Sequence, residues 1–286
     1  MGGGRGRGGG GMGGGCMMAG YVGGQFWDGR AADLVEQAKG PFLNPLEMNN
    51  PNKAAVINAV RNSAYAGMFK QVYGKKSLNN VDTAYNYVAE AIAEYEKSDE
   101  VCQFSSKYDY YTSGMASLTS QELRGLSLFK GKGKCASCHS MQPGPYGKPL
   151  FTNFKYFNVG APGNEDNPFY LLPRKFNPYG TDYVDLGLGG YLNDSMEYGK
   201  FKTPTLRNVA VTYPYMHNGV FRTLGEVVHF YNTRDVESWP SPEVDMNVFR
   251  QMGGGRMMMG SFGRLGLTSQ EEKDIVAFLG TLTDGY

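Results

Sequence analysis

The stretch GKCASCHS at residues 133–140 holds the only Cys-x-x-Cys-His pattern in the chain. Two thiols at this spacing, Cys135 and Cys138, can add to the two vinyl groups of a haem, and the adjoining His139 then lies under the iron as an axial ligand. The alternatives are a zinc half-site and a thioredoxin-type redox pair. Zinc needs two further ligands, the other cysteines are isolated in the sequence, and a redox pair has no use for the histidine. The pattern therefore predicts a covalently attached c-type haem.

Length and charge exclude several classes of protein. A net charge of +1 over 286 residues gives no strong field for binding nucleic acid or an acidic membrane surface, and no apolar run is long enough to span a bilayer. The cysteine content does not indicate a disulfide scaffold. Haem attachment of this type normally happens outside the cytoplasm, and no signal peptide is visible. We therefore expect a periplasmic protein whose chain is mature or truncated.

Two stretches are rich in glycine and methionine, residues 1–24 and QMGGGRMMMG at 251–260. Such segments cannot bury enough apolar surface to order themselves. An RGG-like nucleic-acid tail is an alternative for the first stretch, but its two arginines give thin support. We expect both stretches to be disordered or unreliably recorded, and we assign them no function.

Helical periodicity dominates the remaining chain. The expected helices are a short one in 31–41, stopped by Gly40 and Pro41, two pieces within 52–74, and one at 81–97. No comparable stretch alternates with a period of two residues, so no large sheet is expected. The region 143–198 is rich in Pro, Gly, Asn and aromatic residues, which predicts long irregular loops wrapped over the haem edge.

A repeated pentapeptide locates two further helices. Leu-Thr-Ser-Gln-Glu occurs at 118–122 and again at 267–271, and each copy has the spacing of a capping box that begins a helix. One helix just before the haem motif and another at the C-terminus, crossing each other, are what a cytochrome c fold requires. We therefore expect a c-type haem domain at 117–286, preceded by a separate unit at 25–116.

That preceding unit carries a more specific motif. FWDGRAADLVEQAKGPFLNPLEM at 26–48 resembles the N-terminal domain of bacterial di-haem cytochrome c peroxidases and their MauG-type relatives. The similarity continues in SSKYDYYTSG, CASCHS, KTPTLRNVAVTYPYMHNGVF and TLGEVVHFYN, and covers nearly everything from Gly24 to Tyr286. It implies an all-α fold of two cytochrome c-like domains with long irregular loops. The N-terminal domain is incomplete here, because the family's first Cys-x-x-Cys-His, expected upstream of FWDGR, is absent.

The resemblance also implies roles for residues of the first domain. Gln37 and Glu47 match the family's peroxide-pocket glutamine and glutamate, which fits the need to move a proton between the two peroxide oxygens. Composition alone would make them a helix-surface amide and a solvated loop carboxylate. Trp27 matches a tryptophan that lies between the two haems as an electron relay, and a packed core indole is the alternative.

In the second domain, the resemblance implies the sixth ligand of the His139 iron and a calcium site. Counting from Pro214 places the ligand position at Tyr231, which is typical of the MauG branch, whereas peroxidases have a methionine there. Met216 and His229 are rivals, and a tyrosine that only packs near the haem is the alternative. The backbone carbonyls of Thr212 and Pro214 match family calcium ligands, since calcium prefers oxygen.

The resemblance thus implies a di-haem oxidoreductase that uses hydrogen peroxide as oxidant and passes electrons through the C-terminal haem. Its partners would be a c-type cytochrome, a cupredoxin or a protein substrate, with dimerisation left open. The competing hypothesis is a one-haem electron-transfer protein or subunit without peroxidase activity, because only one haem motif is present.

Overall fold

The computed structural model describes residues 21–246 and 262–286, so the predictions for residues 1–20 and 251–260 lie outside it. Within this part the regular secondary structure is almost entirely helical, as predicted, and long irregular loops connect the helices. The α-helices are α1 (Leu34–Leu43), α2 (Lys53–Arg61), α3 (Ala66–Tyr73), α4 (Val81–Glu96), α5 (Lys107–Thr112), α6 (Ser120–Lys130), α7 (Gly187–Leu192), α8 (Leu224–Thr233) and α10 (Ser269–Gly280). Two short antiparallel strands, β1 (Tyr156–Phe157) and β2 (Phe201–Lys202), form the described sheet.

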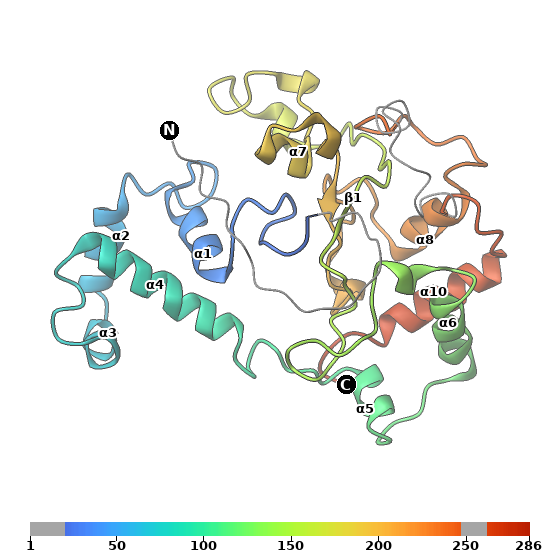
Figure 1. Cartoon of the computed structure of the whole chain (residues 1–286), viewed down its shortest axis with the longest axis horizontal. Helices are drawn as coiled ribbons and strands as arrows, with labels where there is room; N and C mark the ends of the chain where they lie inside the picture. The colour runs from blue at the N-terminus through green and yellow to red at the C-terminus, as the bar shows by residue number, and fades with distance from the viewer. Residues whose placement is uncertain (1–20, 247–261) are drawn as a thin grey trace, which may run out of the picture.

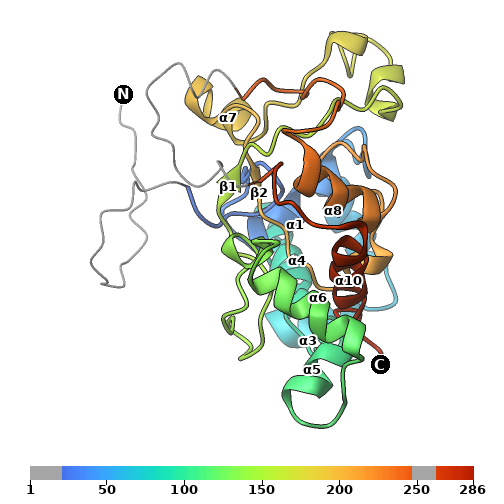
Figure 2. The same ribbon diagram turned by 90° about the vertical axis from the view of Figure 1, so that its right-hand side faces the viewer.

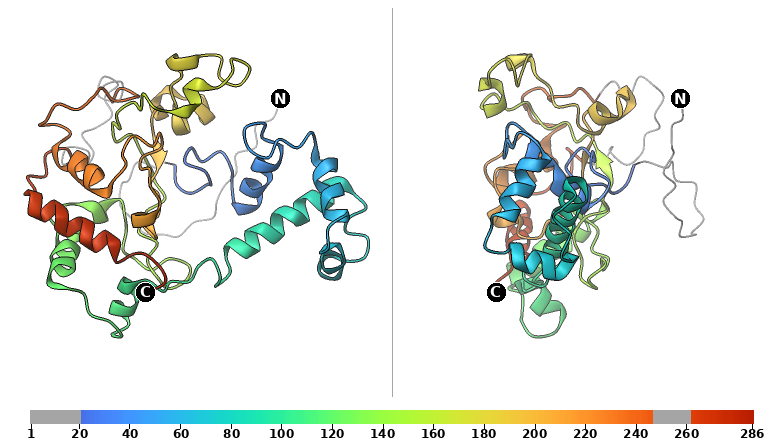
Figure 3. Two further views of the ribbon diagram at one scale, coloured as in Figure 1. Left: turned by 180° about the vertical axis from the view of Figure 1, so that it is seen from behind. Right: turned by 90° about the vertical axis from the view of Figure 1, so that its left-hand side faces the viewer.

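The first group of helices packs around α4. In Figure 1, α2 and α3 lie at one end of this long helix and α1 lies alongside it, and Figure 3 shows its other end leading toward α5. Asparagine side chains cap α2 and α4, because Asn52 and Asn80 accept hydrogen bonds from backbone amides in the first turn. The shared core consists of Val56, Ile57, Val60, Phe69, Leu78, Ala84 and Tyr85.

Helix α1 departs from its predicted end. It continues through Gly40 and Pro41 and stops at Leu43. Proline removes one backbone donor from the helix, which usually ends it. Here Phe42 packs edge-on against Tyr85 of α4 with ring centroids 5.7 Å apart, and the Tyr85 hydroxyl donates a hydrogen bond to the Lys39 carbonyl. Tertiary packing therefore holds a last turn that the local sequence disfavours.

The second group is built on the crossing of α6 and α10, which lie side by side in Figure 2. Both predicted capping boxes are present, with Thr119 paired to Glu122 and Thr268 paired to Glu271. The helices approach closely at Gly125, where an added Cβ would lie 1.9 Å from the Asp274 carbonyl oxygen. Only glycine fits at that contact, so the predicted crossing is confirmed at the level of a single residue.

A buried aromatic cluster fills the core of this second group. Phe129, Phe151 and Phe278 are fully buried, and Tyr108 of α5 meets the rings of Phe151 and Phe278 at 5.4 and 5.7 Å. Helix α5, placed by the sequence at the end of the first unit, therefore contributes to the core of the second. The proposed domain limits at 25–116 and 117–286 remain a prediction.

Residues 21–31, the N-terminal strap, lie against the second group as well. Val22 pairs with Lys155, the Gly23 amide donates to the Phe154 carbonyl at 3.0 Å, and the Tyr156 hydroxyl donates to the Gly23 carbonyl at 2.6 Å. Residues 21–24 thus differ from the expectation of disorder for 1–24. Backbone hydrogen bonds join the strap to Phe154, just before β1, and to Lys202 of β2, and no side-chain pattern in the sequence predicts them.

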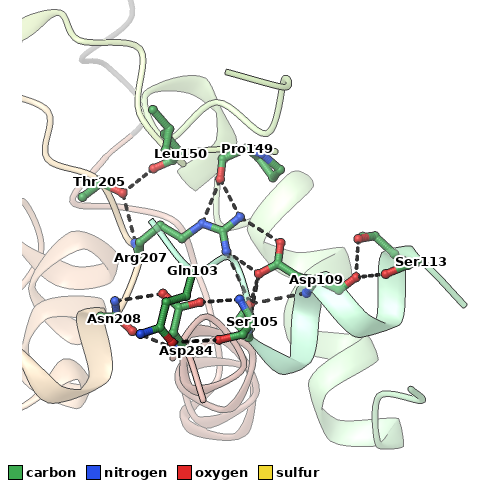
Figure 4. Close-up of polar contacts among 12 residues, drawn as sticks. Gln103, Ser105, Asp109, Ser113, Pro149, Leu150, Thr205, Arg207, Asn208 and Asp284 are labelled. Carbon is green, nitrogen blue, oxygen red and sulfur yellow. Dashed lines mark hydrogen bonds and ion pairs between the residues drawn. The ribbon is translucent and has the colours of Figure 1, made fainter. Parts of the chain in front are cut away.

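A buried ion pair joins α5 to the segment after β2. Figure 4 shows Arg207 facing Asp109, with its Nη2 3.0 Å from the Asp109 Oδ1. The two side chains are 7% and 4% exposed. Arg207 also donates to the Pro149 carbonyl, so its side chain ties two other segments of the chain to its own. Burial alone would raise the pKa of Asp109, but hydrogen bonds from Arg207 and Ser106 hold it below its ordinary value.

Candidate functional site

A largely apolar cavity lies between the Cys135–His139 segment and helix α8. Its apolar walls come from α6, α8 and α10 and include Phe129, Leu224, Val228, Ile275 and Leu279. Most of the residues that the sequence singled out line this one cavity. They are Trp27, Cys135, Cys138, His139, Thr212, Pro214, Met216 and Tyr231.

The haem motif forms a tight turn at one wall of the cavity. Residues Cys135–Ser137 make a 3-10 turn after α6, and the His139 amide closes it by donating to the Cys135 carbonyl at 2.9 Å. The His139 Nδ1 lies 2.9 Å from the Phe151 carbonyl, and only an N–H can bond a carbonyl oxygen. Nε2 is thereby left as the acceptor nitrogen, available to a metal. Burial lowers the pKa of His139, which favours the neutral ring that ligates iron.

Tyr231 reaches the same cavity from α8. A capping box of Thr223 and Glu226 begins this helix, and the Tyr231 ring packs against Phe262 with centroids 5.4 Å apart. Burial raises the pKa of Tyr231, and the thiols of Cys138 and Cys135 add to this shift. Arg234 is the positive group that acts in the opposite direction, but burial outweighs it.

Met216 also lines the cavity, in a backbone conformation with φ of 67°. A positive φ is uncommon for methionine, so the turn that holds it is defined by its surroundings. The structure thus brings both candidate sixth ligands, Tyr231 and Met216, to one cavity. His229 is not among the lining residues. Its ring nitrogens lie 2.9 and 3.1 Å from the carboxylates of Glu272 and Glu237.

Trp27 lies at the border of the cavity and is 49% exposed. Its carbonyl accepts a hydrogen bond from the Lys202 amide at 2.8 Å, which fixes the N-terminal strap beside β2. A half-exposed indole is not a core residue. The packed-indole alternative is therefore less well supported than a position at the edge of the site.

Gln37 and Glu47 do not line the cavity. Gln37 is partly buried on α1, and Glu47 is exposed in the turn that follows, where its carboxylate accepts from the Asn44 amide at 3.1 Å. Both belong to the first group of helices. Their proposed peroxide pocket is thus separate from the His139 cavity, in keeping with a chemistry that needs another haem.

A polar cluster in the cavity wall was not among the sites predicted from the sequence. The His217 ring stacks on Phe201 at 3.7 Å, and its Nε2 lies 2.8 Å from the Glu243 carboxylate, which also accepts from Asn218. Burial alone would raise the pKa of Glu243, but these hydrogen bonds hold it below its ordinary value. His217 lies in the KTPTLRNVAVTYPYMHNGVF stretch, so its place in a family motif could have pointed to it. No sequence motif pointed to Glu243.

The residues present fit a c-type haem. Two thiols, a histidine whose Nδ1 is bonded to a backbone carbonyl and an apolar enclosure are the donor set and surroundings that such a haem takes. No group of three or more His, Cys, Asp or Glu side chains that could hold a bare metal ion occurs within residues 21–246 and 262–286. None of the described helices is long and apolar enough to cross a membrane.

Comparison with known proteins agrees with this geometry. Residues 12–117 match the family model described as di-haem cytochrome c peroxidase. The methylamine utilization protein MauG of Paracoccus denitrificans is 40% identical over 281 residues, which cover 92% of this chain and 68% of that protein. The cytochrome-c peroxidase IdrP1 of a Pseudomonas species is 30% identical over 278 residues, which cover 92% of this chain and 65% of that protein.

A solved structure gives the same answer. The diheme peroxidase BthA from Burkholderia thailandensis superposes with a TM-score of 0.74 at 33% identity, covering 92% of this chain and 66% of that one. The chain thus spans between 65% and 68% of the length of these three relatives. These comparisons confirm the predicted family resemblance, the helical fold and the class of haem-dependent, peroxidase-type oxidoreductases. The chain belongs to the di-haem cytochrome c peroxidase family, which includes MauG.

Proposed function

We propose that this chain is the larger part of a MauG-type di-haem enzyme that reduces hydrogen peroxide and draws the electrons through the haem held by Cys135, Cys138 and His139. The observation that carries the proposal is the shared cavity, in which Tyr231 of α8 and the Cys135–His139 segment line the same apolar space. A phenol oxygen favours ferric iron, whereas a methionine thioether would favour ferrous iron and raise the potential.

The reaction consumes two electrons and two protons for each peroxide and yields two waters. When bound, the haem supplies the redox centre. The Phe151 carbonyl holds the His139 ring in one tautomer, with Nε2 as the nitrogen that would bind iron. The apolar walls exclude water from the cavity. Glu47 would take the proton from one peroxide oxygen and deliver it to the leaving one, and Gln37 would supply an amide to the same peroxide pocket.

The competing function is a one-haem electron carrier, which the single Cys-x-x-Cys-His in the sequence favours. A pyridine haemochrome assay with intact mass on the purified protein separates the two. We expect two haems per chain and peroxide-dependent oxidation of a reduced small c-type cytochrome. One haem per chain together with no peroxide consumption would establish the carrier and remove the enzyme.

A second prediction tests Tyr231 as the iron ligand. We expect the ferric protein to lack the far-red methionine-to-iron band, and Tyr231→Phe to raise the reduction potential of the His139 haem because a ligand that stabilises ferric iron is lost. Met216→Leu is the matched control and should leave the spectrum unchanged. A far-red band that disappears in Met216→Leu and persists in Tyr231→Phe would contradict the assignment.

The proposal extends to a calcium site, a location in the cell and the reaction partners. The carbonyl oxygens of Thr212 and Pro214 accept no hydrogen bond among the described residues, which leaves them available to a calcium ion. We further propose a periplasmic location, consistent with covalent haem attachment. The expected partners are a c-type cytochrome, a cupredoxin or a protein substrate, and the oligomeric state is to be measured with them.

A further inference from the structure

Lys202 is the one lysine or arginine among the described residues that line the cavity. It lies on β2, opposite Tyr156 of β1, and its side chain is partly buried. Its amine donates one hydrogen bond, to the Gly24 carbonyl of the N-terminal strap. An ammonium group has three donors, so two N–H groups of Lys202 have no acceptor in the described protein.

The amine also has no carboxylate partner. Six other lysines form ion pairs within the described residues, including Lys200 with Glu197 on the same segment, whereas none is found for Lys202. The nearest acidic influence is Asp28, whose carboxylate is already bonded to Arg30 at 2.9 Å. Burial lowers the pKa of Lys202, because the cation has lost water without gaining an anion.

The other charged or metal-binding side chains that line the cavity already have a hydrogen-bond partner or a role in haem attachment. Glu243 accepts from His217 and Asn218, and Cys135, Cys138 and His139 are the attachment set. A partly buried cation with two unused donors on the wall of an apolar cavity fits an anionic ligand group. A haem brings two propionate carboxylates, and a carboxylate would be repelled by Glu243 and attracted by Lys202.

We propose that Lys202 binds a propionate of the His139 haem, through one or both of its unused N–H groups. The proposal rests on the haem held at Cys135 and Cys138, and does not depend on peroxide turnover or on a second haem. It makes Lys202 a residue that sets the reduction potential. A cation beside the propionate offsets its negative charge, which would otherwise favour the ferric state.

The test uses the full-length holoprotein and three variants. Lys202→Met keeps most of the side-chain volume and removes the charge, and Lys202→Arg keeps the charge but presents its N–H groups differently. Lys155→Met is the matched control, because Lys155 is exposed and near Cys138 but does not line the cavity. Haem content is measured first, then the reduction potential by redox titration and the propionate-bending bands by resonance Raman spectroscopy.

We expect Lys202→Met to shift the propionate-bending band and to lower the potential of the His139 haem. Lys202→Arg should shift the band while keeping the potential close to that of the parent, and Lys155→Met should leave the band unchanged. Should Lys202→Met fail to fold or load haem, the band in Lys202→Arg still decides the question. An unshifted band in the loaded Lys202 variants overturns the proposal, even if peroxide turnover is normal.

Discussion

Glu47→Gln is expected to slow hydrogen peroxide turnover by about 10²–10⁴-fold, the usual range for loss of a general acid–base group. The amide keeps the shape of the side chain but cannot take a proton from peroxide. The His139 haem lies in a separate cavity, so its ferric and ferrous spectra should not change. The measurement is steady-state oxidation of a reduced c-type cytochrome by a preparation that carries two haems per chain.

Glu36→Gln is the matched control for this variant. Glu36 is also exposed and belongs to α1, where it pairs with Lys39 at 2.6 Å, and the same chemical change there should leave turnover intact. Equal activity in Glu47→Gln and in the parent would remove Glu47 from the mechanism. Loss of activity in both variants would instead point to a general effect on the first group of helices.

Arg207→Met is expected to lower the free energy of unfolding by about 3–5 kcal/mol, the cost of leaving one member of a buried ion pair without its partner. Asp109 would keep its buried carboxylate and lose the guanidinium seen in Figure 4. Urea unfolding of the holoprotein measures the change. Lys97→Met breaks an exposed pair with Glu94 and should leave the free energy of unfolding close to that of the parent, because water screens such pairs.

The Arg207→Met effect should also depend on pH. In the parent, the pKa of Asp109 lies below its ordinary value, so the stability it contributes is present above about pH 4 and is lost as the pH falls through the folded value. Without Arg207, burial would raise this pKa instead. Protonation then relieves the penalty, and the difference between parent and variant should narrow as the pH is lowered. A constant difference from pH 7 to acid would contradict this account.

Local sequence signals predicted the parts of the fold that depend on local chemistry. The capping boxes at Thr119 and Thr268 and the turn at Cys135 are short-range hydrogen-bond patterns, which a spacing of a few residues fully specifies. Features that depend on distant partners were not predictable. Helix α1 runs past Pro41 because Phe42 meets Tyr85, a residue that lies far along the chain.

In the candidate site too, residues within a local motif were predictable and residues that depend on distant partners were not. The attachment residues follow from one motif, and Tyr231 came from a resemblance that the cavity supports. Lys202 and Glu243 could not be found from the sequence, since nothing in a single chain shows that a lysine lacks a carboxylate partner or that a glutamate is buried against His217.

The N-terminal strap limits how far residues 117–286 can be separated from the rest of the chain. Trp27 borders the cavity that the second half encloses, and Tyr108 of α5 fills its core. A gene fragment that begins at residue 117 would therefore encode a haem unit with an open side and a missing core residue. In recombination or domain grafting, residues 117–286 should therefore not be transferred alone. The transferred segment must include residues 21–31 and α5.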